Sequence, residues 1–372
     1  MSGHKLAFTH ETLGQRVILD AGGARRHLAE EVERLGASRV MLIAGDGEAR
    51  IADEVSAGLP VALRWREVVQ HVPVEVAERA RSAAAEAGAD LLVSVGGGST
   101  TGLAKAVAMT THLPIVAVPT TYAGSEATRM WGLTGNREKT TGLDPAVLPV
   151  TVIYDSVLTL SLPVALSVAS GFNGLAHCVD SMWAPGTDPI NQALALEGIR
   201  ALTAGLPKVV AEPEGIDGRD RCLYGAYLSA VSFASAGSGL HHKICHVLGG
   251  AYDLPHAQTH AIVLPHVLAY NAPAVPDAAR RIARAFGARP GQKDDPAEAA
   301  VTALERLRGE VGAPRALKDV GMAEFDIPGA AARVMKVVPP SNPAPVSRES
   351  VEILLRAAWA GRTPGRTSGS RS

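Results

Sequence analysis

Apolar segments of two kinds alternate along the first 155 residues or so of the chain. Short runs rich in Val, Ile and Leu have the continuous hydrophobicity of strands buried inside a sheet. The stretches between them repeat apolar positions at helical spacing. The predicted strands lie at residues 16–22, 39–45, 90–100 and 114–121, and the predicted helices at residues 25–36, 74–89 and 101–112. Strands alternating with helices predict a parallel, doubly wound sheet.

The pattern changes after about residue 156, where long segments rich in Ala and Leu carry few clusters of β-branched residues. Such segments predict packed helices, at residues 163–184, 190–211, 220–236 and 291–312. We therefore expect an α/β domain over 1–156 and an all-α domain over 157–361. The last residues, 362–372, are polar and rich in Gly, Ser and Arg, so they are predicted to be disordered.

Composition narrows the choice of partners. The 372 residues are 47% hydrophobic and carry 36 basic and 37 acidic side chains, for a net charge of −1. This balance gives no general attraction to nucleic acid. No apolar run approaches the roughly 20 residues of a membrane span, and the N-terminus lacks the apolar core of a signal peptide. We expect a cytoplasmic protein whose three cysteines are reduced and mostly buried.

A glycine-rich loop joins one predicted strand to the next helix in "VSVGGGSTTGLAKA" (93–106). Gly96, Gly97 and Gly98 let the backbone approach a ligand without interference from a Cβ atom. The backbone N–H groups of Ser99, Thr100 and Thr101 would open the helix, and such a helix start favours a pyrophosphate. We interpret the three glycines and Ser99 as cofactor contacts. The alternative is an ordinary tight turn, because the loop is neither GxGxxG nor a P-loop.

A second loop, "VPTTYAGSEATRMWGLT" (118–134), also follows a predicted strand. Its hydroxyl side chains, Thr120, Thr121 and Ser125, could reach the ribose or a phosphate of a nucleotide. Alone the segment would be read as a turn. Paired with the glycine loop, it predicts the opposite wall of a cofactor cleft.

Six of the twelve histidines fall within residues 241–266. They are His241, His242, His246, His256, His260 and His266. His242 and His246 are four apart on a predicted helix, so their rings should share one face. An earlier helix adds His177 in "FNGLAHCVD", four positions after Asn173. The cluster is open to three interpretations, which are metal ligation, handling of a polar substrate, and core histidines without a chemical role.

Several long motifs resemble the iron-containing (group III) alcohol dehydrogenase family. They are "GGGSTTGLAKA", "PTTYAGSE", "GFNGLAHCVD", "GLHHKICHVLGGAYDLPHAQTHAIVLPH" and "NPAPVSRESVEILLRAAWAG". The resemblance covers about residues 5 to 361. It implies a Rossmann-like, dehydroquinate synthase-like N-terminal domain with a parallel sheet and an all-α C-terminal domain. It also implies NADH or NADPH as cofactor and a homodimer.

Metal-dependent members of this family hold Fe²⁺ or Zn²⁺ with an aspartate and three histidines. The resemblance places their counterparts here at Asn173, His177, His246 and His256. An amide brings no charge to a dication, so this set would bind metal less tightly than one with a carboxylate. The family's glycine loop usually continues to an aspartate, where this chain has Gly102. Its threonine loop is also one residue shorter than in the alcohol dehydrogenases. No bound metal is expected.

These departures agree with the branch of the family that reduces maleylacetate, which is understood to work without metal. Its reaction adds hydride to the C=C bond of a dianionic enone, giving an enolate and then 3-oxoadipate, a step of aromatic-compound catabolism. The resemblance implies a small dicarboxylate as substrate. The side chains suited to steady its negative charge are His177, His242, Lys243, His246 and His256, with His242 and His246 as the first candidates for the acid.

Other interpretations stay open at this point. Lys243 could be a solvated lysine at a helix edge with no part in the reaction. The chain could be a metal-dependent alcohol or lactaldehyde dehydrogenase that tolerates Asn173. It could also keep the fold but bind a small anion without redox turnover.

Overall fold

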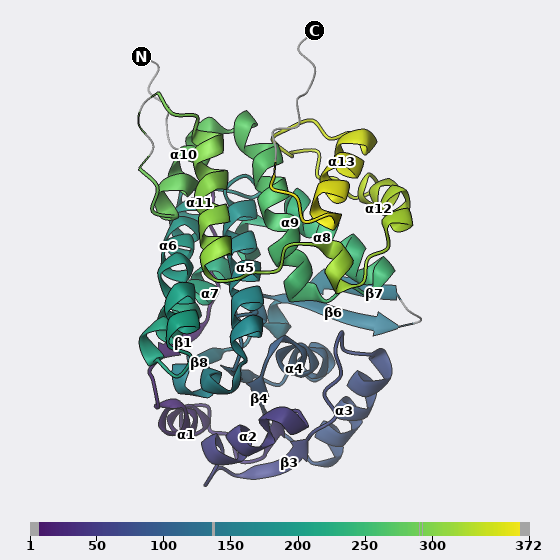
Figure 1. The fold of residues 1–372 in the computed structure, drawn as a ribbon. Helices are drawn as coiled ribbons and strands as arrows, with labels where there is room; N and C mark the ends of the chain where they lie inside the picture. Colours follow the sequence, from purple (N-terminus) through teal and green to yellow (C-terminus); the bar gives the residue numbers. More distant parts are fainter. Residues whose placement is uncertain (1–6, 136–137, 290, 292, 365–372) are drawn as a thin grey trace.

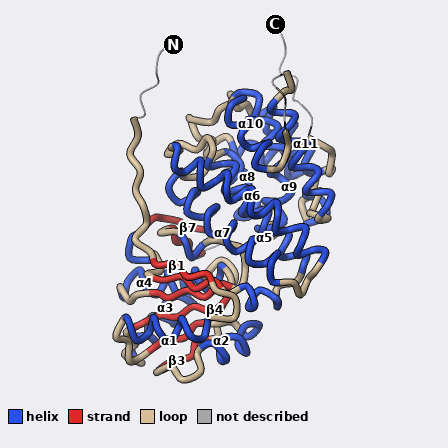
Figure 2. The backbone as a smooth tube through the Cα atoms, turned by 90° about the vertical axis from the view of Figure 1, so that its left-hand side faces the viewer, coloured by secondary structure: helices blue, strands red, loops and turns tan. Residues whose placement is uncertain are grey.

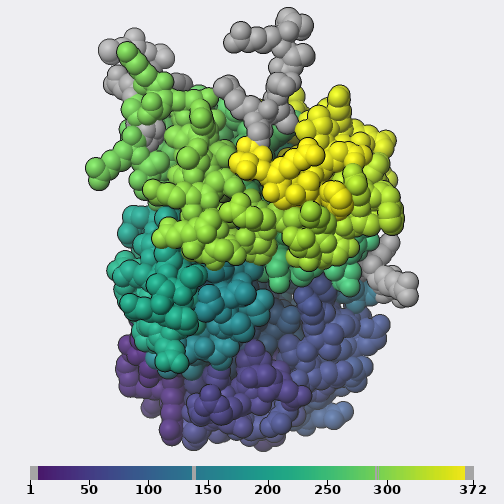
Figure 3. Space-filling model, in the orientation of Figure 1, coloured from purple at the N-terminus to yellow at the C-terminus, as the bar shows by residue number. Residues whose placement is uncertain are grey.

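The protein has two structural parts, an α/β half at one end and a helical half at the other (Figure 1). The structure is a computed structural model that describes residues 7–135, 138–289, 291 and 293–364. In a space-filling view the N-terminal residues, in purple and blue, form one end, and the green and yellow C-terminal residues form the other (Figure 3).

A six-stranded parallel sheet forms the centre of the first half, in the order β1-β8-β5-β4-β2-β3. The strands are β1 (Arg16–Leu19), β2 (Val40–Ile43), β3 (Val61–Trp65), β4 (Leu91–Gly96), β5 (Ile115–Pro119) and β8 (Thr151–Tyr154). The four strands predicted from apolar runs all form, each at or within its predicted range. The prediction missed β3 and β8; in β3 the residues alternate between half-buried and exposed positions, which makes a weaker signal.

Helices cover both faces of this sheet (Figure 2). On one face, α1 (Ala24–Arg34) and α2 (Ala49–Val55) pack their apolar residues against the strands. On the other face lie α3 (Val74–Glu86) and α4 (Gly98–Thr111). The doubly wound arrangement is therefore confirmed. An antiparallel hairpin, β6 (Met130–Gly135) with β7 (Glu138–Leu143), begins within the segment 118–134 that was predicted to be a loop.

The second half consists of helices. They are α5 (Val164–Ser181), α6 (Pro189–Ala211), α7 (Ile216–Ala236), α8 (Leu240–Tyr252), α9 (His256–Asn271), α10 (Pro276–Ala285), α11 (Pro296–Glu310), α12 (Ile327–Val334) and α13 (Arg348–Trp359). Among the described residues from 157 to 361 there is no strand, as predicted. The four helices predicted here correspond to α5, α6, α7 and α11. Most of the predicted disordered tail, residues 365–372, lies outside the described residues.

Most of α5 is buried, which explains why its sequence is so apolar. Its Phe172, Leu175 and Val179 pack in a core shared with α6, α7 and α9. Burying a polar side chain costs free energy unless it finds a partner, so the few polar residues of this buried helix are candidates for a function. Asn173, His177 and Asp180 are three of them, and all three belong to the candidate site.

Candidate active site

The glycine loop adopts the geometry that its sequence predicts. Gly97 caps α4, which begins at Gly98 directly after β4. Gly96 has φ of +151°, and a Cβ atom there would lie 2.4 Å from Thr100 Oγ1. The prediction placed the free N–H groups at residues 99–101, but Thr101 N donates to Gly97 O at 3.1 Å. The open donors of the first turn are therefore those of residues 98–100.

The threonine loop lies beside the glycine loop because β4 and β5 are neighbouring parallel strands. Thr120 N donates to Gly96 O at 3.1 Å. A Cβ atom built on Gly97 would lie 3.0 Å from Thr121 Cγ2. The two loops thus form one continuous edge. Adjacent parallel strands end side by side, so the two loops start at neighbouring positions of this edge. That the threonine loop forms the opposite wall of a cofactor cleft stays a prediction.

A buried lysine that the sequence interpretation overlooked holds the threonine loop in place. Lys105 Nζ, on α4, donates to the carbonyl oxygens of Ser125, Thr128 and Met130 at 2.6, 2.8 and 2.8 Å. Burial lowers the pKa of Lys105 to about 7, and the nearby Glu126 opposes this shift. The available signal was a lysine within the apolar run "GLAKAVAM". Ser125 is therefore positioned by α4 rather than by its own loop alone.

Helix α7 connects this edge to the histidines. A Cβ atom built on Gly124 would lie 2.7 Å from Ala230 Cβ on α7. Phe233 is three residues further along the same helix, so it lies about one turn away on the same face. Its ring packs on His177 and His242, with centroids 4.6 and 4.3 Å apart. The candidate cofactor loops and the histidine cluster are therefore neighbours.

His177 and His242 are the centre of the cluster. Their rings stack at 4.9 Å with 12° between the planes, and both side chains are buried. Burial lowers the pKa of His177 to about 3, and His246 adds to the shift. Burial likewise holds the pKa of His242 well below its usual value. His177 is thus a neutral imidazole near neutral pH.

Asp180 holds His242 in one orientation. Its Oδ2 accepts hydrogen bonds from His242 Nδ1 at 2.7 Å, Gly239 N at 3.0 Å and His242 N at 3.2 Å. The fit is tight, since a Cβ atom on Gly239 would lie 2.5 Å from Asp180 Oδ1. The other ring nitrogen, His242 Nε2, is buried without a hydrogen-bond partner within the described part of the chain. Sequence reasoning missed Asp180, although an acid three residues after His177 in an apolar helix was a usable signal.

Burial raises the pKa of Asp180 to about 7, against the opposing effect of its backbone N–H donors. A carboxyl and an imidazole in such close contact titrate as a pair. Below about pH 7 the pair carries one more proton than above it, and His242 Nε2 can then carry an N–H that points away from Asp180. Above that pH, Asp180 is ionised and Nε2 has only a lone pair. The pair can therefore deliver a proton near neutral pH.

The other predicted catalytic residues are less buried than His177 and His242. His246 is exposed, and its ring is 6.1 Å from that of His242. Lys243 is half-buried one residue after His242. His256 is half-buried at the start of α9, 4.3 Å from the ring of His260. The two histidines four apart on α8 therefore differ sharply in burial, which their shared helical face did not predict.

The chain matches a known family over nearly all of its length. Residues 15–156 match the family described as iron-containing alcohol dehydrogenase, and residues 167–359 match the C-terminal part of the Fe-containing alcohol dehydrogenase family. The chain belongs to the iron-containing alcohol dehydrogenase family. It is therefore an oxidoreductase, as predicted.

Individual members of the family are close relatives. Maleylacetate reductase of Sphingobium indicum is 44% identical over 362 residues, covering 96% of this chain and 99% of the relative. The crystal structure of an iron-containing alcohol dehydrogenase from Corynebacterium glutamicum is 58% identical, with a TM-score of 0.93 over 99% of this chain and 100% of that one. The structure of maleylacetate reductase from Rhizobium sp. strain MTP-10005 is 40% identical, with a TM-score of 0.89 over 97% and 100%.

The residues present fit the family's iron or zinc poorly. The set implied by the resemblance contains the amide of Asn173 and imidazoles, so it brings no negative charge to the buried Asn173 and His177. Asn173 Oδ1 and His177 Nδ1 are buried without hydrogen-bond partners in the described part of the chain. The nearby carboxylate, Asp180, is directed at His242 Nδ1 instead. A dication here would lack the anionic ligand that offsets its desolvation.

Replacing Gly98 with valine should raise the KM for NADH by roughly tenfold or more, the equivalent of about 1.4 kcal/mol of binding. A Cβ atom at this position meets only Ala123 Cβ, at 3.4 Å, so the protein itself tolerates it. Steady-state kinetics and the thermal midpoint are the measurements. Gly14→Ala, in open space, is the control. An unchanged KM would remove the glycine loop from the cofactor site.

Proposed function

We propose that this oxidoreductase reduces the C=C bond of maleylacetate to give 3-oxoadipate, using NADH or NADPH and no catalytic metal. Curated relatives of 40–44% identity over nearly the whole chain carry the name maleylacetate reductase. The observation that carries the proposal is the Asp180–His242 pair, with its Nε2 unpartnered, beside His177 and Asn173. The Asp180–His242 pair can supply a proton and a hydrogen-bond donor, whereas metal-dependent members of the family use a metal cation.

The nicotinamide dinucleotide would lie along the edge formed by the two loops. Its pyrophosphate would meet the open N–H groups of residues 98–100 next to Gly96 and Gly97. Thr120, Thr121 and Ser125 would border the same edge. Since Gly124 contacts α7 beside Phe233, the nicotinamide end would point toward His177 and His242.

The reaction needs hydride at one carbon and a proton at another. When bound, the reduced nicotinamide would supply a hydride, which would add to the olefinic carbon β to the ketone. The π electrons move to the ketone oxygen and form an enolate, and protonation of the α carbon completes the reduction. The N–H at His242 Nε2 would steady the enolate or return the proton. His177, Lys243, His246 and His256 supply further donors for the substrate's two carboxylates.

The cell compartment and the assembly are also part of the proposal. All three cysteines are free thiols and buried. Reduced thiols are typical of the cytoplasm, where we place the enzyme. No helix of the described residues is long and apolar enough to cross a membrane. A homodimer is proposed from the family resemblance.

The purified enzyme should oxidise NADH when maleylacetate is added, at the same rate before and after exhaustive treatment with a chelator. Absorbance of NADH, product analysis and metal content of the same sample are the measurements. If activity disappears with the metal and returns with added Fe²⁺ or Zn²⁺, the metal-free mechanism is wrong. If NADH is bound but maleylacetate is not reduced, the substrate is wrong.

A second candidate is a metal-dependent alcohol dehydrogenase. The observation that favours it is the name of the 58% identical Corynebacterium glutamicum structure, iron-containing alcohol dehydrogenase. It predicts oxidation of short alcohols with NAD⁺ and a dependence on added Fe²⁺ or Zn²⁺. The assay with chelator separates the two candidates directly. A relative that binds an anion without turnover would show neither activity.

A further inference from the structure

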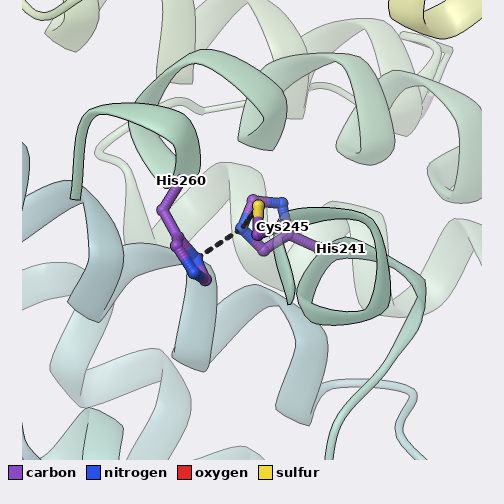
Figure 4. Close-up of side chains that lie close together, drawn as sticks. All are labelled: His241, Cys245 and His260. Carbon is purple, nitrogen blue, oxygen red and sulfur yellow. Dashed lines mark hydrogen bonds between the residues drawn. The ribbon is translucent and has the colours of Figure 1, made fainter. Parts of the chain in front are cut away.

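Three potential metal ligands converge behind the candidate active site. His241 and Cys245 are four apart on α8, and His260 faces them from α9 (Figure 4). One donor atom from each side chain lies within 4.8 Å of the others, and all three side chains are buried. Among the described residues, this is the one group of His, Cys, Asp and Glu side chains that converges so closely.

Ordinary hydrogen bonding accounts for only part of this arrangement. His241 Nε2 lies 2.9 Å from His260 Nδ1 and 3.6 Å from Cys245 Sγ. An imidazole nitrogen has one proton or one lone pair, so it can satisfy one of these two contacts at a time. A cation between the three atoms would satisfy all of them. We propose that His241, Cys245 and His260 form a site for Zn²⁺ that is distinct from the family's metal position.

The dimensions are close to those of a zinc site. Zn–N bonds of roughly 2.1 Å and a Zn–S bond of roughly 2.3 Å at a tetrahedral angle separate nitrogen from sulfur by roughly 3.6 Å. The distance from His241 Nε2 to Cys245 Sγ matches this value. Two nitrogen ligands would be roughly 3.4 Å apart. The His241–His260 contact is shorter than that, so one ring must turn outward slightly.

The chemistry of the donors also suits this ion. Imidazole nitrogen and thiolate sulfur are the ligands zinc uses most, whereas hard cations such as Mg²⁺ prefer oxygen. Binding would deprotonate Cys245. The Cys245 thiolate would supply one negative charge as a direct ligand. That charge offsets part of the cost of burying a dication, whereas the amide and imidazoles around Asn173 supply none.

The ion would connect α8 to α9, the two helices that carry His242 and His256. The ring of His242 lies 5.1 Å from His241 and 4.9 Å from His260. The site would therefore stabilise the helices that present the reactive histidines. It needs no part in hydride transfer, so it is compatible with the metal-free reaction proposed above and does not depend on it.

The test uses the full-length protein produced in minimal medium with Co²⁺ or Zn²⁺, because a buried site fills most readily during folding. After gel filtration with a chelator, wild-type protein should retain about one metal per chain. The Co²⁺ form should show the near-ultraviolet band of thiolate-to-cobalt charge transfer. Cys245→Ser should lose both the band and the metal. Cys222→Ser, a matched change at another buried thiol, should keep both.

The outcomes separate this site from the family's metal position. Metal that is retained by Cys245→Ser, or that gives no thiolate band, would sit elsewhere and overturn the proposal. Wild-type protein that binds no metal would overturn it as well. If Cys245→Ser does not fold, His260→Asn takes its place, and the wild-type band alone still reports the thiolate. Asn173→Ala should leave the band unchanged.

Discussion

Asp180→Asn should lower the kcat of NADH-dependent maleylacetate reduction by roughly 10²-fold or more. Asparagine has the same size and can still accept hydrogen bonds from Gly239 N and His242. It cannot hold or share a proton, so His242 loses the partner that supplies its acid form. The KM for NADH should stay the same, because the hydrogen bonds of Asp180 go to Gly239 and His242 and not to the glycine loop.

The pH profile distinguishes this positioning role from a structural one. In wild-type enzyme, kcat should fall as pH rises through about 7, where the Asp180–His242 pair loses its shared proton. In Asp180→Asn, the fall in kcat at alkaline pH should disappear or shift to a different pH. The groups that face His242 and can influence its pKa are His177 from α5, His241 and His246 from α8, and His256 and His260 from α9.

Asp188→Asn is the matched control. Asp188 is also a buried aspartate with hydrogen bonds to backbone N–H groups, but it caps α6 and pairs with His10. Its replacement should lower the thermal midpoint and leave the pH profile unchanged. If Asp180→Asn lowers only the thermal midpoint, with kcat and pH profile intact, Asp180 is a structural residue and the proposed acid is wrong.

Lys243→Ala should lower kcat/KM for maleylacetate by roughly 10- to 100-fold, the loss expected when a charged hydrogen bond to a carboxylate is removed. Lys243 is half-buried on α8 and follows His242 in the sequence. We expect its ammonium group to bind a carboxylate of the substrate. Stability should change little, since the side chain is not part of the core. Initial rates at several maleylacetate concentrations are the measurement.

Two further variants show whether the effect depends on the positive charge at residue 243. Lys243→Arg keeps the charge and should recover part of the lost kcat/KM, though its planar group differs in shape. Lys336→Ala, at an exposed position after α12, should behave like wild type. Wild-type kinetics in Lys243→Ala would mean that Lys243 is a solvated lysine, the alternative left open by the sequence.

The sequence motifs did not indicate which histidine of α8 is buried. The resemblance chose His246 as a ligand counterpart and left His242 outside that set. In the structure His246 is exposed, whereas His242 is buried, stacked on His177 and anchored by Asp180. We therefore propose His242 as the principal reactive histidine of α8. Helical spacing states which residues share a face, but burial depends on the helices packed against that face.

Local patterns in the sequence are enough to predict the α/β and helical halves and the glycine loop between β4 and α4. They also show the amide of Asn173 where a carboxylate was expected. These features are local, because strand and helix patterns and turn residues act over a few neighbouring positions. Only the tertiary structure brought Asp180 to His242, 62 residues away, and His241 to His260, 19 residues away. Such contacts arise when α5, α8 and α9 pack together, and no local pattern specifies which buried polar side chains will then meet.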